Sequence, residues 1–290
     1  MNQSQVGNSN GPRRTYVVTE SLLKRRNHFF HARNEADGEK VFIKRYLEDP
    51  GFQRERFVQE LLAQKQQHPN LLYPLEFHDS TKIGVFPFIS GGTLEALLKR
   101  LGPMSIEQLK PVVEGTAKGL EHLHYNGVVH RDIKPSNILL QSTNPEIEEI
   151  NYRILEKGNI TAQIFDFDMS RHPDIAELDE DERGMTLIYG TPRYMSPEAW
   201  DTPAVDRRSD LYALAVTIYH AISGEYPFNG GNAGEIMFAH QEKPISKITE
   251  YNASLPQDFN GFFQKALAKN PGERFQTPEE LARAYVEITG

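Results

Sequence analysis

The chain has 290 residues, of which 38% are hydrophobic, enough for one large domain or two small lobes around a cleft. Its formal net charge of -8 argues against nucleic acid or an anionic membrane surface as the main partner. The absence of cysteine excludes disulfides, thiolate catalysis and cysteine–zinc sites. We find no secretory signal and no apolar run long enough to span a bilayer.

The N-terminal part of the chain predicts a tail followed by a β-hairpin. Residues 1–14 are rich in Asn, Gln, Ser and Gly, which is typical of a disordered tail. Two β-prone runs then surround an Asp-Gly turn at Asp37, and the second run ends at Lys44. A lysine at the end of a strand is usually just solvated, so Lys44 alone indicates no function.

Strand and helix patterns follow one another through the middle of the chain. Residues 52–65 carry apolar side chains at spacings of three and four, which predicts an amphipathic helix. Strands are expected at 71–77 and 83–89. The pattern becomes helical from Leu94, and 109–126 form a long apolar-periodic segment.

The polar stretch 130–137 lies between two apolar runs, so we expect a loop whose ends are anchored in the core. Asp132 can accept a proton, Lys134 can neutralise phosphate, and Asn137 can ligate a metal ion through its carbonyl oxygen. Phosphoryl transfer needs such a set, because its catalysis is mostly positioning and charge neutralisation.

The same stretch resembles the catalytic loop H-R-D-x-K-x-x-N of eukaryotic-type serine/threonine protein kinases. The alternative is a polar surface loop that matches by chance, but several residue types at fixed spacing argue against it. Further motifs similar to those of the family stand at 166–168, 190–198 and 270–275, and their style is nearest to that of bacterial Ser/Thr kinases.

The resemblance covers nearly the whole chain and implies an α+β, bilobal protein-kinase-like fold. Residues 15–290 would form the kinase domain. A small β-rich lobe with one helix, at about 15–86, would be joined by a hinge at about 87–92 to a mainly helical lobe at about 93–290. No further domain is expected after the last helix.

The resemblance gives Lys44 the role of holding the α- and β-phosphates of ATP, in a pair with a glutamate from the 52–65 helix. Glu60 is our choice for this glutamate. It lies one residue nearer to the following His-Pro-Asn than the family suggests, so Glu55 stays open. A glutamate that only faces solvent is the alternative for either position.

The resemblance also implies an adenine site. Phe86 would be the gatekeeper, and the carbonyl of Pro87 and the N–H of Ile89 would contact adenine at the hinge. Leu139 would also contact the nucleotide. Phe42 replaces the small alanine that usually covers the adenine, and its ring could either stack on adenine or fill its pocket.

Two Mg²⁺ ions would be bound by Asn137 and Asp166, whose oxygen atoms are hard ligands. Asp168 stands where the family's D-F-G motif has glycine. Its carboxylate could tune the metal site, or the residue could stiffen a backbone that glycine leaves loose. Asp-x-Asp pairs in ordinary surface loops are the alternative, which the order of the motifs disfavours.

The glycine-rich loop of the family, G-x-G-x-x-G, is absent from this chain. Residues 22–27 should occupy its place and contain no glycine, which normally lets backbone amides approach phosphate closely. Lys24 and Arg25, with Arg26, could supply side-chain cations to the phosphates instead. A solvated basic strand is the equal alternative.

Residues 169–196 would be the activation segment, in which Thr191 matches the position that helps dock a Ser/Thr hydroxyl. Arg131 could pair with a phosphate added to this segment. Farther along, the resemblance implies that Asp210 holds the backbone of the catalytic loop. It also implies a buried ion pair between Arg274 and Glu198.

Residues 141–161 replace what is usually a tight turn between two strands, so we interpret them as an insertion with a short surface helix. Because loop length changes stability slowly, we expect the insertion to be dispensable for folding.

Taken with these motifs, the sequence predicts an ATP- and Mg²⁺-dependent kinase that phosphorylates Ser or Thr of protein substrates, inside the cell and in the cytoplasm. Lys134 favours Ser/Thr over Tyr, because tyrosine kinases usually lack this lysine. The alternative is a pseudokinase that acts as a binding or scaffolding module, which would explain the lost glycines and Phe42. The retained polar catalytic groups favour activity. The oligomeric state cannot be predicted.

Overall fold

The protein is described by a computed structural model that covers residues 14–23, 27–147, 149–180 and 189–290. The predicted tail, apart from Arg14, lies outside these ranges. So do Lys24 and Arg25, and their predicted contact with phosphate stays a prediction.

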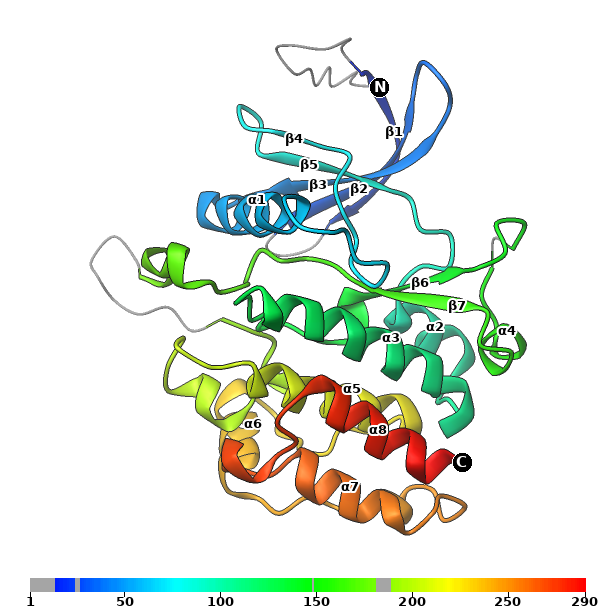
Figure 1. The fold of residues 1–290 in the computed structure, drawn as a ribbon, viewed down its shortest axis with the longest axis vertical. Helices are drawn as coiled ribbons and strands as arrows, with labels where there is room; N and C mark the ends of the chain where they lie inside the picture. The colour runs from blue at the N-terminus through cyan, green and yellow to red at the C-terminus, as the bar shows by residue number, and fades with distance from the viewer. Residues whose placement is uncertain (1–13, 24–26, 148, 181–188) are drawn as a thin grey trace.

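The first lobe is an antiparallel five-stranded sheet with one helix packed beside it (Figure 1). The strands follow one another in space in the order β1-β2-β3-β5-β4. The predicted hairpin is formed by β2 and β3, and Gly38 permits its turn by adopting a φ of 76°. The elements of this lobe are β1 Tyr16–Leu23, β2 Asn27–Asn34, β3 Lys40–Tyr46, α1 Asp49–Ala63, β4 Glu76–His78 and β5 Ile83–Pro87.

The strand expected at 71–77 is mostly absent, because only β4 at its end joins the sheet. The residues before it pair with the other lobe instead. The Leu72 N–H donates to the carbonyl of Ile164 (2.9 Å), and the Ile164 N–H donates to the carbonyl of Asn70 (2.8 Å). Pro74, which has no N–H to donate, follows this contact. The segment therefore ties the two lobes together.

The second lobe is built mainly of helices around α3 and α5 (Figure 1). Helix α3 begins at a capping box formed by Ser105 and Gln108, and α5 is buried along almost its whole length. The helices are α2 Leu94–Leu101, α3 Ile106–Tyr125, α4 Tyr152–Glu156, α5 Arg208–Ser223, α6 Ala233–Glu242, α7 Asp258–Ala266 and α8 Pro278–Thr289. The structure thus confirms the predicted bilobal α+β fold. None of the helices in the described ranges is long and apolar enough to cross a membrane.

The second lobe also contains short 3-10 helices, and one of them includes Glu198, which forms the predicted ion pair with Arg274. Arg274 is 2% exposed, and its guanidinium donates to both carboxylate oxygens of Glu198, at 2.8 and 2.7 Å. This bidentate geometry confirms the predicted pair and fixes the residues just after the expected activation segment to the rest of the helical lobe. The 3-10 helices are Pro135–Asn137, Pro173–Asp179, Pro192–Tyr194, Pro197–Trp200, Ile248–Glu250 and Pro271–Glu273.

The connection between the lobes lies against a small hairpin of β6 (Ile138–Ser142) and β7 (Ile160–Ile164). The Leu140 N–H donates to the carbonyl of Gly92 at 2.9 Å. A Cβ at Gly91 would lie 2.0 Å from the carbonyl oxygen of Leu140, so only glycine fits there. This close approach places the strand that follows the catalytic loop directly beside the connection.

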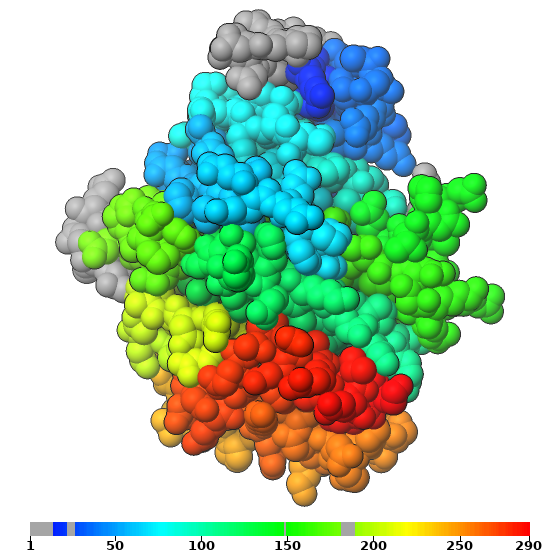
Figure 2. All heavy atoms as spheres, in the orientation of Figure 1, coloured from blue at the N-terminus to red at the C-terminus, as the bar shows by residue number. Residues whose placement is uncertain are grey.

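The β6–β7 connection contains the expected short helix, α4, but it is not a separable surface insertion. Figure 2 shows this green segment projecting at the right-hand edge of the molecule. Ile150 and Leu155 are nevertheless fully buried in the main core, and Gln108 of α3 donates to Glu156 at 2.8 Å. The interpretation as a surface insertion is therefore wrong, because its apolar side chains pack into the core of the helical lobe. This burial argues against the prediction that the segment is dispensable for folding.

Candidate active site

The loop 130–137 is held by one buried carboxylate at the start of α5. Asp210 accepts the backbone N–H groups of His130 and Arg131, each at 2.9 Å, as predicted. Arg131 has a φ of 64°, a conformation that a non-glycine residue keeps only when its surroundings impose it. Burial alone would raise the pKa of Asp210, but the hydrogen bonds from His124 and from the loop lower it, so the carboxylate stays charged.

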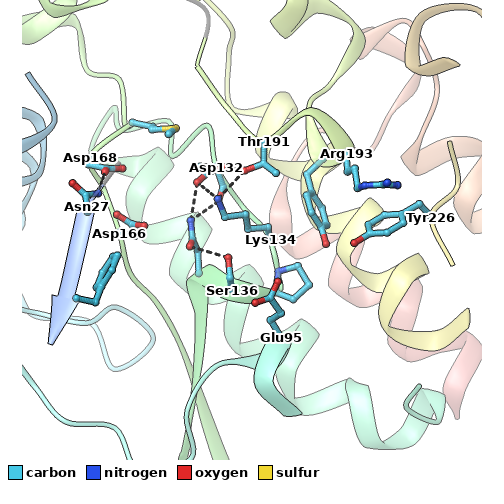
Figure 3. A pocket seen from close by; sticks show the side chains of 15 residues that line it. Asn27, Glu95, Asp132, Lys134, Ser136, Asp166, Asp168, Thr191, Arg193 and Tyr226 are labelled. Carbon is cyan, nitrogen blue, oxygen red and sulfur yellow. Dashed lines mark hydrogen bonds and ion pairs between the residues drawn. The ribbon is translucent and has the colours of Figure 1, made fainter. Parts of the chain in front are cut away.

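The carboxylate of Asp132 faces the cavity and is held on both oxygens. Its Oδ1 accepts from the Thr191 hydroxyl at 2.7 Å, and its Oδ2 accepts from Lys134 Nζ at 2.5 Å (Figure 3). Lys134 also donates to the Thr191 hydroxyl at 2.7 Å. A hydroxyl group, a cation and a carboxylate thus meet at one point of the cavity.

Lys44 is fully buried and lies among three carboxylates. It donates to Glu55 at 2.6 Å and to Asp166, and Asp168 lies 3.4 Å away. Burial alone would lower the pKa of Lys44, but the three carboxylates raise it well above its ordinary value. The lysine is therefore a fixed positive charge at the lobe interface.

The choice of Glu60 as the partner of Lys44 is wrong, and Glu55 takes this role. Glu55 lies on the face of α1 that is buried together with Val58 and Leu62, three and seven residues farther on. Glu60 lies on another face, where it accepts from Arg56 at 2.6 Å on the exposed side of the helix. A shift of five residues turns a side chain by about 140° around the axis, because a turn holds about 3.6 residues.

The oxygens expected to hold a metal ion lie on one cavity of about 400 Å³. The Nδ2 of Asn137 donates to the backbone carbonyl of Asp132 at 2.9 Å, which directs the amide. Burial alone would raise the pKa of Asp166, but the Lys44 ammonium lowers it, while burial and the Asp166 charge raise the pKa of Asp168. The cavity is lined by Asn27, Phe29, Glu95, Asp132, Lys134, Pro135, Ser136, Asn137, Asp166, Asp168, Met169, Thr191, Arg193, Tyr194 and Tyr226.

These groups suit Mg²⁺ that arrives with phosphate oxygens rather than a cage built by the protein. No cluster of three or more His, Cys, Asp or Glu side chains suited to a metal ion occurs in the described ranges. The candidate ligands are therefore the carboxylate of Asp166 and the amide oxygen of Asn137. Two protein ligands are enough, because Mg²⁺ commonly takes few of them when a substrate supplies phosphate.

The predicted adenine contacts lie beside this cavity but not in its lining. Phe42 stacks on Phe86 with ring centroids 5.1 Å apart, and its ring meets Phe165 edge-on at 6.0 Å. Ile89 and Leu139 belong to the same buried cluster. Of the two possibilities for Phe42, this packing favours a ring that fills the space between the lobes.

Sequence reasoning missed the carboxylate on which three arginines converge. Asp179 accepts from Arg131 at 2.8 Å and from Arg54 at 3.2 Å, and Arg171 lies 3.3 Å away. Arg131, proposed as a phosphate partner, already has this acidic partner within the activation segment. The acidic run around 174–182 was visible in the sequence, but nothing there distinguishes Asp179 from its neighbours.

The class of protein is indicated by a bilobal α+β domain whose cavity is lined by Asp132, Lys134 and Asn137, the arrangement that the resemblance of the catalytic loop implies. The family profile described as "Protein kinase domain" matches residues 28–286, and the chain therefore belongs to the protein kinase family.

The curated relatives include mycobacterial enzymes. Serine/threonine-protein kinase PknB of Mycobacterium tuberculosis (strain ATCC 25618 / H37Rv) is 31% identical over 205 residues, 70% of this chain and 30% of the relative. PknB of Mycobacterium leprae (strain TN) is 30% identical over 248 residues, 83% of this chain and 36% of the relative. Serine/threonine-protein kinase PknH of the same M. tuberculosis strain is 28% identical over 254 residues, 86% of this chain and 37% of the relative. The chain thus spans about a third of the length of these proteins.

Proposed function

We propose that this chain is a protein serine/threonine kinase domain that transfers the γ-phosphate of ATP to hydroxyl groups of protein substrates. One observation carries the proposal: Asp132 holds the hydroxyl of Thr191 at 2.7 Å beside Lys134. A substrate hydroxyl placed in this position would be oriented by the carboxylate and would lie next to a cation.

Each group then has a defined task in the transfer. Asp132 orients the attacking hydroxyl and accepts its proton, and Lys134 neutralises charge on the phosphate being transferred. Lys44, held by Glu55, binds the phosphates that stay behind. Asp166 and Asn137 would hold Mg²⁺, which supplies further positive charge to the phosphates when bound.

The aromatic cluster between the lobes supports a place for adenine at its edge. We place adenine at the edge of this cluster, next to Leu139, with the carbonyl of Pro87 and the N–H of Ile89 as its polar contacts. Phe86, which packs on Phe42, would limit the depth of this site. Because ATP is a cytoplasmic cosubstrate, we place the domain in the cytoplasm.

The proposal is tested by transfer of labelled phosphate from ATP to the protein itself and to a generic Ser/Thr acceptor. We expect the wild type to transfer phosphate in the presence of Mg²⁺, and Asp132→Asn to lose kcat while it still binds nucleotide. A wild type that binds the nucleotide but transfers no phosphate would contradict the proposal. Phosphotyrosine among the products would contradict the assigned specificity.

A further inference from the structure

Two of the glycine losses noted in the sequence meet each other in space. Residues 22–27 stand in place of G-x-G-x-x-G, so Asn27 occupies the position of its last glycine, and Asp168 occupies that of the glycine in D-F-G. The two residues are 141 positions apart, yet Asn27 Nδ2 donates to Asp168 Oδ2 at 2.6 Å (Figure 3). Both side chains are buried. The substitutions are therefore one structural feature and not two independent losses.

The hydrogen bond joins two walls of the cavity, one from each lobe, at one end of it (Figure 3). Asn27 is the first residue of β2 in the sheet lobe, whereas Asp168 follows β7 in the helical lobe. Both residues line the cavity together with Asp132 and Asn137. The bond therefore sets how far apart the two walls stand where phosphate would bind.

The surroundings make this bond strong. The acceptor oxygen is excluded from water, and hydrogen bonds in such places are stronger than exposed ones. Lys44 lies 3.4 Å from the same Oδ2, which connects the pair to the lysine among the three carboxylates. Within the described part of the chain, Asp168 Oδ1 has no hydrogen-bond partner, so Asn27 is the direct anchor of this side chain.

We propose that Asn27 and Asp168 are a positioning pair that fixes the width of the nucleotide cavity at its phosphate end. Glycine brings backbone close to phosphate, whereas here a buried side-chain bond holds the start of β2 against the metal loop. The proposal rests on the proposed function in that ATP is the ligand. It predicts that the two residues act together, because loss of either one removes the hydrogen bond between the lobes.

A double-mutant cycle tests the pair, with calorimetric affinity for Mg²⁺ and a non-hydrolysable ATP analogue as the readout. We expect Asn27→Ala and Asp168→Ala each to weaken binding about tenfold, and the double variant also about tenfold, because contacting residues are not additive. The KM for ATP should rise in parallel while kcat stays within about twofold, because the pair does not touch the hydroxyl held by Asp132. A double variant weakened about a hundredfold would show two independent residues and overturn the proposal.

Two more variants keep the test decisive if an alanine variant fails to fold. Asp168→Asn retains an acceptor oxygen, so its affinity should stay within about threefold of wild type. Asn27→Asp alone sets two carboxylates face to face and should bind worst, whereas Asn27→Asp combined with Asp168→Asn reverses the bond and should restore affinity. Loss of affinity in Asp168→Asn, or failure of the exchanged pair to recover, would mean that the charge at 168 acts without Asn27.

Asn34→Ala is the matched control for Asn27→Ala. Asn34 lies at the other end of β2, is also buried, and donates to an aspartate, Asp37, at 3.0 Å, but this contact is local to a turn outside the cavity. Its loss should leave nucleotide affinity unchanged. If it weakens affinity as much as Asn27→Ala, the effect comes from the strand as a whole and the proposal is wrong. A wild type that binds the analogue without transferring phosphate contradicts the proposed function alone, whereas one that binds no nucleotide contradicts both.

Discussion

Arg131 of the catalytic loop and Asp179 of the activation segment form an ion pair, with Nη2 and Oδ1 2.8 Å apart. Arg54 from α1 donates to the same oxygen at 3.2 Å, so one carboxylate connects the catalytic loop, the helix of the sheet lobe and the activation segment. Tyr189 adds to this junction, because both guanidinium groups lie over its ring, at 4.2 Å for Arg54 and 4.9 Å for Arg131.

Removal of this carboxylate should loosen the activation segment. In Asp179→Ala the clustered arginines lose the carboxylate that neutralises them. Removal of one partner of a buried ion pair lowers the free energy of unfolding by about 3 kcal/mol. We expect a lower melting temperature and a reduced kcat. Asp174→Ala is the control, because Asp174 is exposed on the same segment and its loss should change neither quantity. Equal behaviour of the two variants would show that the junction has no role.

Glu55→Gln should impair phosphate transfer far more than Glu60→Gln. Glu55 holds Lys44 at 2.6 Å in a buried pair, whereas Glu60 lies on the exposed face of α1. A displaced lysine would misplace the phosphates, and misplacement of a reacting group costs about a hundredfold in rate. Steady-state kinetics on both variants measures the difference. Comparable losses in the two variants would restore Glu60 as a partner of Lys44.

Phe42→Ala should open the space between the lobes. The ring of Phe42 fills this space by stacking on Phe86, so we expect the smaller side chain to lower the KM for ATP. The lost packing should destabilise the fold by about 2 kcal/mol, less than for a fully buried phenylalanine. Phe238→Ala, at a 54% exposed position, should change neither quantity. A higher KM in Phe42→Ala would instead indicate that the ring stacks on adenine.

Leu155→Ala should show that the β6–β7 connection belongs to the core. Leu155 is fully buried, and a cavity left by leucine in a packed core costs about 3 kcal/mol of unfolding free energy. Denaturant titration measures this loss directly. Leu47→Ala, at a half-exposed site, should cost less than about 0.5 kcal/mol. Unchanged stability in Leu155→Ala would instead support the original prediction that the β6–β7 connection is dispensable for folding.

Stability should fall as the pH drops from about 6.5 towards 4, with His240 as one source. Burial, together with the Lys269 ammonium, lowers the pKa of His240 from 6.5 to about 4. In this window the unfolded chain binds a proton that the folded state does not, so acid favours unfolding, by up to about 3 kcal/mol from this group. The slope should be shallower in His240→Asn. Tyr212→Phe removes only the hydroxyl that lies 2.8 Å from His240 Nδ1, and this variant should keep the wild-type slope of stability against pH. An unchanged slope in His240→Asn would exclude this histidine as a source.

The sequence by itself determined the features that depend on neighbours along the chain. The Asp-Gly turn predicted the hairpin of β2 and β3, because a turn is closed by residues adjacent to it. Asp132, Lys134 and Asn137 were predicted to belong to one loop, and in the structure Lys134 and Asn137 both donate to the Asp132 carboxylate. The bilobal α+β fold was predicted from the resemblance of the motifs to those of protein kinases, and the structure confirms it.

Only the tertiary structure decided which residues from distant segments of the chain contact one another. A helical period shows that α1 has a buried face, but Glu55 rather than Glu60 meets Lys44 because of how α1 lies on the sheet. In the sequence, Asn27 and Asp168 are two unrelated replacements of glycine, whereas in the structure Asn27 Nδ2 and Asp168 Oδ2 are 2.6 Å apart. Such contacts depend on the packing of whole elements against one another, which local propensity does not specify. Hydrogen-bond and ion-pair partners separated by more than a hundred residues therefore emerge only from the folded chain.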